Sequence, residues 1–177
     1  MRIISGSEKS RKLKMVNIET TRETSDMVRE SMFNLMNSYE KKGNVLDLFS
    51  GSGSIGLEAL SRGAAKGYFN DLNKTAVEIT LDNIKTLKYE NKAFVSNLEY
   101  MKCLESLKNI KFNFIFLDPP YKLDCIDEIL KFISENEMLS EDGLIVYESG
   151  KEYNYNNELF ELYKEKKYGI KKVTILR

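Results

Sequence analysis

The sequence contains no histidine, and it has only two cysteines and two prolines among its 177 residues. The lack of histidine excludes Ser-His and Cys-His nucleophile pairs, histidine general bases and most transition-metal sites. Cys103 and Cys125 form no CxxC motif, so neither a disulfide framework nor a zinc site is expected. An enzyme with this composition must work by positioning its substrate, by carboxylates or by a cofactor, and we expect no metal.

Long apolar runs are also missing from the chain. The longest useful one covers residues 114–117, which is the length of a strand and far below the roughly 20 residues that cross a bilayer. Residues 1–6 become polar too early for a secretory signal peptide. We therefore expect a cytoplasmic protein that does not bind a membrane.

The net charge is zero, but the charges are unevenly distributed. Residues 1–16 carry five basic and one acidic side chain, and residues 150–177 carry seven basic and four acidic ones. Basic ends around an acidic centre can present a positive patch to phosphate groups, although such runs more often form ordinary solvated surface. The side chains of the N-terminal patch that we single out are Arg2, Arg11, Lys12 and Lys14.

Two parts can be distinguished along the chain. Residues 1–42 are predicted to form an N-terminal extension, with two short strands in residues 1–16 and an amphipathic helix capped by Thr24-Ser25-Asp26. Residues 43–177 alternate between strand and helix patterns, which is typical of a parallel, doubly wound sheet. The expected strands are residues 45–49, 67–71, 93–96, 112–117 and 144–148, and the expected helices are residues 55–62, 75–87, 101–107 and 124–135.

The end of the chain has a different pattern. Residues 164–168 and 171–176, separated by Gly169 and Ile170, predict a β-hairpin. An antiparallel strand added to a parallel sheet resembles the Rossmann-like class I methyltransferase fold more than a dehydrogenase. The expected fold class is therefore α/β, with a mostly parallel seven-stranded sheet, a terminal antiparallel hairpin and the small N-terminal extension.

A glycine loop follows the first strand of the alternating part. Gly51, Gly53 and Gly56 fit the pattern GxGxxG, in which the backbone turns sharply, a ligand approaches closely and a helix N-terminus offers free N–H groups. Asp71 comes 20 residues after Gly51, where its carboxylate can accept hydrogen bonds from both hydroxyls of a ribose. The motif alone does not separate a dinucleotide site from an S-adenosylmethionine site.

Asp47 favours the S-adenosylmethionine site. It lies four residues before the first glycine, where a negative charge would oppose a pyrophosphate and suit a sulfonium and an ammonium group. Asn97, after the third strand, could hydrogen-bond the adenine amino group or could serve only its turn. Asp47 and Asp71 could instead be ordinary structural acids. The predicted S-adenosylmethionine site consists of Asp47, Phe49, Gly51, Gly53, Asp71, Leu72, Asn97 and Leu98.

The most specific signal is the turn Asp118-Pro119-Pro120-Tyr121, directly after a buried strand. Its prolines fix the backbone, remove two N–H donors and leave carbonyl acceptors, and Asp118 adds an acceptor-only carboxylate. Such a turn suits a ligand with an –NH₂ group, and Tyr121 can stack on the ring that carries it. A rigid turn that only ends the strand is the alternative. Because the carboxyl ends of parallel strands form one crevice, Asp118 and the glycine loop should face the same site.

These residues together predict methylation of an exocyclic amine. Such an amine is a poor nucleophile because its lone pair is conjugated into the ring, and hydrogen bonds to Asp118 and the Pro119 carbonyl favour a pyramidal nitrogen aimed at the methyl group. A carboxylate with a pKa of about 4 is too weak to deprotonate the neutral amine first, so Asp118 is assigned electrostatic stabilisation and late proton acceptance. The predicted catalytic residues are Asp118, Pro119, Pro120 and Tyr121.

The chain resembles the amino-methyltransferases with an (Asp/Asn)-Pro-Pro-(Tyr/Phe) motif and, within that group, the RsmD family of 16S rRNA guanine-N2 methyltransferases. Similar segments extend over essentially all of the chain, and besides the motif they include residues 1–6, 21–34, 47–64 and 147–149. The resemblance implies that Asp47, the glycines and Asp71 hold S-adenosylmethionine and that residues 118–121 hold the guanine. It also implies 16S ribosomal RNA within a small-subunit particle as partner, a monomeric enzyme, and RNA contacts by the basic N-terminal patch.

Three other functions are compatible with parts of the sequence. The first is the same chemistry on adenine N6 of DNA or RNA, or on a protein glutamine; Asp118 in place of Asn and the basic N-terminal segment favour RNA guanine instead. The second is a nicotinamide dehydrogenase, against which Asp47 and the two prolines argue. The third is a non-catalytic ribosome-binding protein, against which the retained Asp118 and glycine loop argue.

Overall fold

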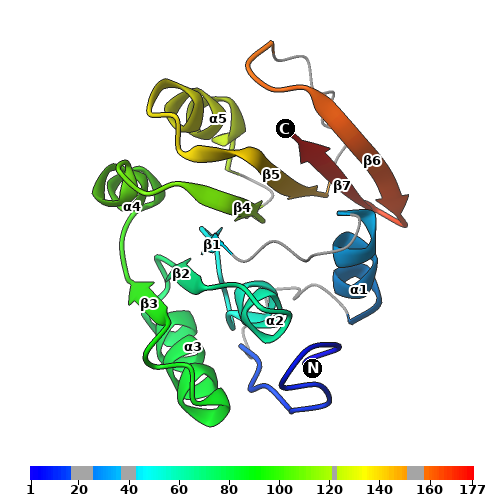
Figure 1. The fold of residues 1–177 in the computed structure, drawn as a ribbon, viewed down its shortest axis with the longest axis vertical. Coiled ribbons are helices and arrows are strands. Elements are labelled where there is room, and N and C mark those ends of the chain that lie inside the picture. The colour runs from blue at the N-terminus through cyan, green and yellow to red at the C-terminus, as the bar shows by residue number, and fades with distance from the viewer. Residues whose placement is uncertain (17–25, 37–42, 121–122, 151–157) are drawn as a thin grey trace.

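One seven-stranded sheet forms the centre of the protein in the computed structural model, which describes residues 1–16, 26–36, 43–120, 123–150 and 158–177. The strands are β1 (Asn44–Asp47), β2 (Lys66–Asn70), β3 (Ala93–Ser96), β4 (Phe112–Leu117), β5 (Leu139–Ser149), β6 (Leu162–Tyr168) and β7 (Lys171–Leu176). Their order in the sheet is β3-β2-β1-β4-β5-β7-β6 (Figure 1). Strands β1 to β5 are parallel, and β7 lies antiparallel between β5 and β6.

Helices cover both faces of this sheet. They are α1 (Asp26–Leu35), α2 (Ser54–Ser61), α3 (Lys74–Leu87), α4 (Tyr100–Leu107) and α5 (Ile126–Glu135). The apolar side chains of α1, α2 and α3 join one core cluster and those of α4 and α5 join a second one. The predicted α/β fold with a terminal antiparallel hairpin is confirmed. No described helix combines the length and the apolar character needed to span a membrane.

Most bounds agree with the sequence prediction to within two residues, and the two largest differences concern β5 and the N-terminal segment. Strand β5 begins at Leu139 instead of residue 144, because Leu139 pairs with Phe112 across a register shift that interrupts the alternating pattern. The two strands predicted in residues 1–16 reduce to a single antiparallel bridge between Arg2 and Lys12. Much of the backbone between them bonds to α2 instead of to a partner strand. The predicted helix cap at Thr24 and Ser25 lies outside the described residues.

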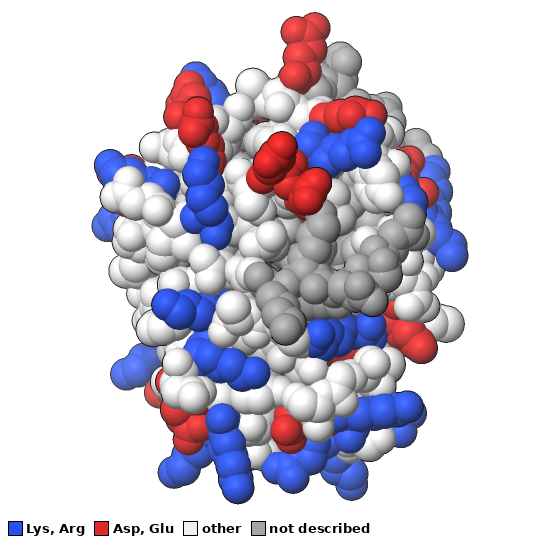
Figure 2. All heavy atoms as spheres, in the orientation of Figure 1, with Lys and Arg blue, Asp and Glu red and all other residues white. Residues whose placement is uncertain are grey.

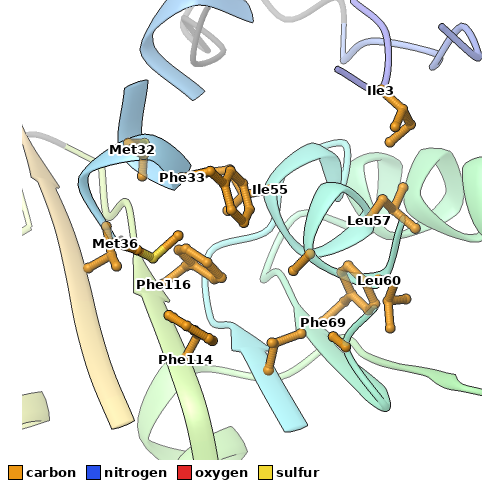
Figure 3. Packing of buried hydrophobic residues seen from close by; sticks show 14 of the residues in the cluster. Ile3, Met32, Phe33, Met36, Ile55, Leu57, Leu60, Phe69, Phe114 and Phe116 are labelled. Carbon is orange, nitrogen blue, oxygen red and sulfur yellow. The ribbon is translucent and has the colours of Figure 1, made fainter. Parts of the chain in front are cut away.

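Helix α1 contributes directly to the main core. Met32, Phe33 and Met36 lie over the sheet beside Phe116 of β4 (Figure 3), and the ring centroids of Phe33 and Phe116 are 5.9 Å apart. Burying such side chains stabilises a fold by roughly 1.5–3 kcal/mol each. The described residues of the predicted extension therefore share a core with the rest of the chain, and a division at residue 42 stays a prediction.

A buried carboxylate joins the N-terminal segment to α2. Glu58 is fully buried, and its oxygens accept hydrogen bonds from the backbone N–H groups of Ile4 (2.7 Å) and Ser5 (3.0 Å) and from Nε of Arg62 (2.7 Å). Nε of Arg29 on α1, also fully buried, lies 3.9 Å from the same carboxylate. Since a buried charge is tolerated only when it is paired and hydrogen-bonded, Glu58 determines where the first residues and α1 sit on α2.

Replacing Glu58 with alanine should destabilise the protein by about 3–5 kcal/mol, because the change leaves the buried Arg29 charge and two N–H groups without this acceptor. Urea unfolding followed by circular dichroism measures the loss. Glu105→Ala is the matched control: this exposed carboxylate pairs only at the surface, with Lys108, and its removal should change stability little. Equal, small losses in both variants would contradict the role assigned to Glu58.

Candidate functional site

The sheet brings the predicted site residues to one edge. Strand β2 lies on one side of β1 and β4 lies on the other, so the order of the strands reverses direction at β1. At such a reversal a crevice is expected outside the carboxyl ends of the strands. Asp47 lies opposite Phe116 in the register, and Asp118 follows two residues later on the neighbouring strand. With about 3.3 Å per residue and about 4.8 Å between strands, the Cα atoms of Asp47 and Asp118 are roughly 8 Å apart.

Two of the three motif glycines shape the loop, and the third packs a helix. Gly51 and Gly53 have φ angles of 54° and 75°, in the left-handed region that glycine adopts without strain. A Cβ atom added to Gly51 would meet no other atom within 4 Å, so the loop leaves open space there. A Cβ atom on Gly56 would lie 2.4 Å from the ring of Phe69. Gly56 therefore allows α2 to approach β2 closely.

Asp47 places a buried carboxylate under this loop. Its side chain is only 4% exposed, and Oδ2 accepts a hydrogen bond from the backbone N–H of Gly56 (3.0 Å). Burial raises the pKa of Asp47 to about 7, against the lowering effect of this hydrogen bond, and the charge of Asp71 raises it further. A cation bound nearby would favour the ionised form. Asp47 thus both braces the start of α2 and offers a negative charge to a cationic ligand.

Asp71 connects the glycine loop to the loop after β2. Oδ2 accepts from the N–H of Gly51 (2.8 Å) and Oδ1 from the N–H of Asn73 (2.8 Å). A carboxylate has about four lone-pair sites, so each oxygen can still accept a hydroxyl of a ribose. The side-chain nitrogen of Asn97 donates to the carbonyls of Asp71 (2.7 Å) and Leu72 (2.9 Å). Oδ1 of Asn97 is therefore the atom suited to accept from an adenine amino group.

Apolar side chains lie beside these polar loops. Leu72 and Leu98 are 71% and 36% exposed, after β2 and β3 at the same edge of the sheet. Phe49, in the loop after β1, is half-buried, with its ring centroid 5.8 Å from that of Tyr100. Apolar surface next to a few fixed polar groups is typical of a site for a flat heterocyclic ring.

Sequence reasoning missed Asn70, which is buried at the end of β2. Its Nδ2 donates to the carbonyls of Leu48 (3.3 Å) and Leu98 (3.0 Å), and its Oδ1 accepts from Oγ of Ser96 (2.7 Å) and from the N–H of Leu98 (3.1 Å). One amide thus joins the carboxyl ends of β1, β2 and β3. The only signal in the sequence is a polar residue at a position where the strand pattern calls for an apolar one.

Helix α3 braces the glycine loop from the side, and these contacts were missed as well. Oγ1 of Thr80 donates to the carbonyl of Gly51 (2.9 Å), and Nδ2 of Asn83 donates to the carbonyl of Ser52 (2.9 Å). Both side chains are buried on the face of α3 that packs against the protein, where helical periodicity makes polar residues unusual. The hydroxyl of Ser50 is buried, and it has no hydrogen-bond partner among the described residues.

The proline turn follows β4 directly. Asp118 is half-buried, Pro119 is buried and Pro120 is exposed, and the Pro120 carbonyl accepts from the N–H of Leu123 (2.8 Å). That carbonyl is thus used within the protein. The predicted acceptors for an amine are Asp118 and the Pro119 carbonyl. Tyr121 lies outside the described residues, so its stacking role stays a prediction.

Carboxylates surround the turn on the side of α5. Burial and then negative neighbours, including Asp118 and Asp124, raise the pKa of Tyr147 to about 12. Burial, Asp124 and Glu128 likewise raise the pKa of the Cys125 thiol to about 11. This side of the turn therefore has a negative potential, which suits a positive charge that develops on an amine and opposes phosphate.

The basic side chains predicted to bind RNA are mostly engaged within the protein. The structure places Arg11 against the last turn of α3. Since α3 begins at the carboxyl ends of the strands and runs back, this turn lies at the end of the sheet opposite to Asp118. Lys12 is exposed. The contacts of the other three are Arg2 with Asp26 (3.8 Å), Arg11 with Glu8 (3.8 Å) and the Thr86 carbonyl (2.8 Å), and Lys14 with Asp82 (2.6 Å).

The groups at this edge of the sheet fit S-adenosylmethionine. Among the described residues, a buried carboxylate faces a glycine loop with open space, a second carboxylate can accept further hydrogen bonds, and exposed leucines flank the loops. These features suit a cationic ligand with a ribose and a flat base, whereas the negative charge of Asp47 opposes a pyrophosphate. Among the described residues, no group of three or more His, Cys, Asp or Glu side chains is arranged to hold a metal ion.

Comparisons with known proteins agree with this chemistry. Residues 1–177 match the family described as Conserved hypothetical protein 95. A Haemophilus influenzae protein named Ribosomal RNA small subunit methyltransferase D is 38% identical over 96% of this chain and 90% of its own length. Its namesake from Escherichia coli is 36% identical over 84% and 74%. The solved structure named "Putative methyltransferase yhhF from Escherichia coli" has a TM-score of 0.86 at 32% identity, covering 99% of this chain and 96% of that one.

Replacing Asp47 with asparagine should remove a pH-dependent loss of stability. The pKa of about 7 in the folded protein lies above the ordinary 3.8, so the contribution of Asp47 to the stability of the parent is greatest below pH 3.8, falls as the pH rises toward 7 and is constant above it. Between pH 4 and pH 8 the free energy of unfolding of the variant should rise by roughly 2–4 kcal/mol relative to that of the parent. Urea unfolding at several pH values measures the difference. A difference that stays constant across this range would show that Asp47 ionises normally.

Proposed function

Because the chain belongs to the RsmD family of S-adenosylmethionine-dependent methyltransferases, we propose that it methylates the exocyclic N2 amine of a guanine in small-subunit (16S) ribosomal RNA. One observation carries this proposal: the Asp118-Pro119 turn, which we assign to the amine, lies one strand away from Asp47 and the glycine loop. The names of the relatives, both ribosomal RNA small subunit methyltransferases, support RNA as the substrate class.

We assign binding of the cofactor to the loops after β1, β2 and β3. When bound, S-adenosylmethionine supplies a methyl group activated by a positively charged sulfur. Asp47 would compensate that positive charge, Asp71 would accept from the ribose hydroxyls, and Oδ1 of Asn97 would accept from the adenine amino group. The remaining residues assigned to this site are Phe49, Gly51, Gly53, Leu72 and Leu98.

Asp118 and the Pro119 carbonyl are assigned to the target amine. Two acceptors fix the two N–H bonds of the amine and so favour a pyramidal nitrogen, whose lone pair is no longer conjugated with the ring and can attack the methyl group. As the nitrogen gains a bond to carbon it becomes positive, and the carboxylate stabilises that charge and accepts the surplus proton afterwards. Its weak basicity excludes proton removal before the bond forms. Tyr121 is proposed to stack on the guanine, which must be unpaired or flipped to reach the turn.

The same acceptors would suit adenine N6 in nucleic acid or a protein glutamine, so the product must be identified. Parent protein and labelled cofactor should be incubated with small-subunit RNA, DNA and ribosomal protein, and digests should be analysed by mass spectrometry. The proposal expects N2-methylguanosine from RNA. N6-methyladenine or methylglutamine as the main product would contradict the assignment to guanine N2.

We also propose that a monomeric enzyme acts on a small-subunit particle in the cytoplasm, so particles should be tested beside naked RNA.

Asp118→Ala should lower the single-turnover rate of methyl transfer by at least 10²- to 10³-fold, because the carboxylate stabilises charge that exists only during the reaction. Cofactor affinity, measured by calorimetry, should be nearly unchanged. Glu90→Gln is the control: this exposed acid after α3 lies at the opposite edge of the sheet, and its loss should alter neither quantity. Near-normal methylation by Asp118→Ala would refute the mechanism proposed for the turn.

The basic N-terminal residues, Arg2, Arg11, Lys12 and Lys14, are proposed as further RNA contacts. Replacing Arg11, Lys12 and Lys14 with glutamine should weaken RNA binding and flatten its dependence on salt, since fewer counterions are released. Because Arg11 and Lys14 also bond within the protein, thermal unfolding must be recorded for the same variant. Parallel salt curves with equal affinity would leave this cluster with a structural role alone.

A further inference from the structure

The side chain of Asn70 fixes the backbone of Leu98, one of the residues assigned to the cofactor site. Asn70 ends β2 and is 1% exposed. Its Oδ1 accepts a hydrogen bond from the N–H of Leu98 (3.1 Å), and its Nδ2 donates to the carbonyl of the same residue (3.0 Å). Because two bonds to one residue restrict its rotation, the loop after β3 is held in a fixed position relative to β2.

The partners of the Asn70 amide determine its orientation. The N–H of Leu98 can only donate and the carbonyls of Leu48 (3.3 Å) and Leu98 can only accept, so the oxygen and nitrogen of the amide cannot exchange places. The hydroxyl of Ser96 donates to Oδ1 as well (2.7 Å). The main-chain carbonyl of Asn70 accepts from the N–H of Ser50 in the glycine loop (2.8 Å). A carboxylate at this position would have no donor for the two carbonyls.

The position of Asn97 depends on the same contacts. Its Nδ2 donates to the carbonyls of Asp71 (2.7 Å) and Leu72 (2.9 Å), which attaches the end of the side chain to the loop after β2. Its main chain continues into Leu98, which Asn70 holds. Oδ1 of Asn97, the acceptor assigned to the adenine amino group, therefore keeps one position as long as both attachments are present.

The apolar side chain of Leu98 is presented by the same backbone. It is 36% exposed at the carboxyl ends of the strands, beside the polar loops assigned to the cofactor. A side chain on a fixed backbone requires little ordering when a ligand binds, so more of the contact energy contributes to affinity. Asn70 thus controls both groups that are assigned to one edge of the base.

We propose that Asn70 is a positioning residue that sets the selectivity of the cofactor site for adenine, through its hold on Leu98 and the neighbouring Asn97. This inference rests on the proposed function, which assigns the cofactor to the loops after β1, β2 and β3, and it adds the residue on which base selectivity depends. Hypoxanthine is the informative comparison, because it carries an oxygen where adenine carries the amino group. That oxygen would place an acceptor against Oδ1 of Asn97.

A role in stability alone is the competing explanation for Asn70. Buried main-chain groups must be hydrogen-bonded, and this amide satisfies the carbonyl of Leu48 and both main-chain groups of Leu98. If that were its only role, its loss would destabilise the protein and weaken every ligand of the site by the same factor. The preference for adenine over hypoxanthine would then stay as it is in the parent.

The test measures this preference by calorimetry with S-adenosylhomocysteine and S-inosylhomocysteine, which differ in the base alone. The parent should bind the adenosine form at least about tenfold more tightly, because the oxo group leaves Oδ1 of Asn97 without a donor. In Asn70→Ser the ratio of the two affinities should fall by about fivefold or more, because the short side chain cannot hold Leu98 on both sides.

Ser96→Ala is a milder variant for the same measurement. It removes the hydroxyl that donates to Oδ1 of Asn70 and leaves the amide in place, so the ratio should fall by about two- to threefold. Thermal unfolding of both variants shows whether they fold. Ser96→Ala decides the question if Asn70→Ser does not fold.

The matched control is Asn83→Ser on α3. Asn83 is as deeply buried as Asn70 and also bonds a cofactor loop, through the carbonyl of Ser52, but its other partners are the N–H and carbonyl of Lys14. The N-terminal segment lies at the lower end of the molecule in Figure 1, where Figure 2 shows many Lys and Arg side chains. This variant should lose stability and overall affinity, whereas its preference for adenine should remain that of the parent.

Three results would overturn the inference. One is a folded Asn70→Ser variant with the ratio of the parent or, where that variant does not fold, a Ser96→Ala variant with the ratio of the parent. Another is an equal fall of the ratio in Asn83→Ser, which would make the effect a general consequence of destabilisation. The third is a parent that binds both forms equally, since no selectivity would then remain for Asn70 to set.

The product analysis separates this inference from the proposed function. A parent that prefers adenine and loses the preference in Asn70→Ser, yet forms no N2-methylguanosine, refutes the guanine assignment alone. A parent that forms N2-methylguanosine while its folded Asn70→Ser variant keeps the preference refutes the role of Asn70 alone.

Discussion

The hydrogen bond from the N–H of Gly56 to the buried carboxylate of Asp47 is the contact on which the rest of the structure depends. It attaches the first turn of α2 to the end of β1, and α2 carries Glu58. That second carboxylate holds the N-terminal segment and lies beside Arg29 of α1. Helix α1 in turn contacts β6 through Ser31 and Tyr168. A series of polar contacts thus runs from the middle of the sheet to its last strand.

The burial of Asp47 also affects which ligand this site would favour. A carboxylate with a pKa near 7 is poorly compensated by its surroundings, because one backbone N–H does not replace the water lost on burial. A cationic ligand would supply the missing compensation, so part of the binding energy would come from relief of this burial. The pyrophosphate of a nicotinamide dinucleotide would instead add negative charge near Asp47 and so disfavour its ionised form further. Asp47 would therefore favour S-adenosylmethionine over a nicotinamide dinucleotide.

The sequence predicts those parts of the fold that local patterns determine. Strands β3 and β4 have the predicted bounds because each is a short apolar run limited by turn residues. The proline turn could be placed because both prolines of the chain stand there. The single bridge in residues 1–16 could not be predicted, since the partners of that backbone are side chains of Glu58 and Ser61, far along the chain.

The candidate site could be predicted to a similar extent. The carboxylates and glycines of the motifs reach one edge because strand order follows from the alternation of strands and helices. The braces of that edge could not be found, because Asn70 and Asn83 act through backbone carbonyls of distant loops and belong to no motif. The charges of Arg11 and Lys14 could be read from the sequence, whereas the contacts of Arg11 with the Thr86 carbonyl and of Lys14 with Asp82 on α3 depend on tertiary structure.

Strand β6 precedes β7 in the chain but joins the sheet only through it, because β7 lies between β5 and β6. β6 can therefore join the sheet only together with β7 or after it. Until β7 pairs with β5, the β5 edge is open and Glu148 lacks the ammonium of Lys171 that neutralises it in the folded protein. A charged side chain on an open edge discourages pairing with a wrong strand. The carboxylate of Glu148 thus discourages wrong pairing while the β5 edge is open, and it forms an ion pair with Lys171 once β7 is in place.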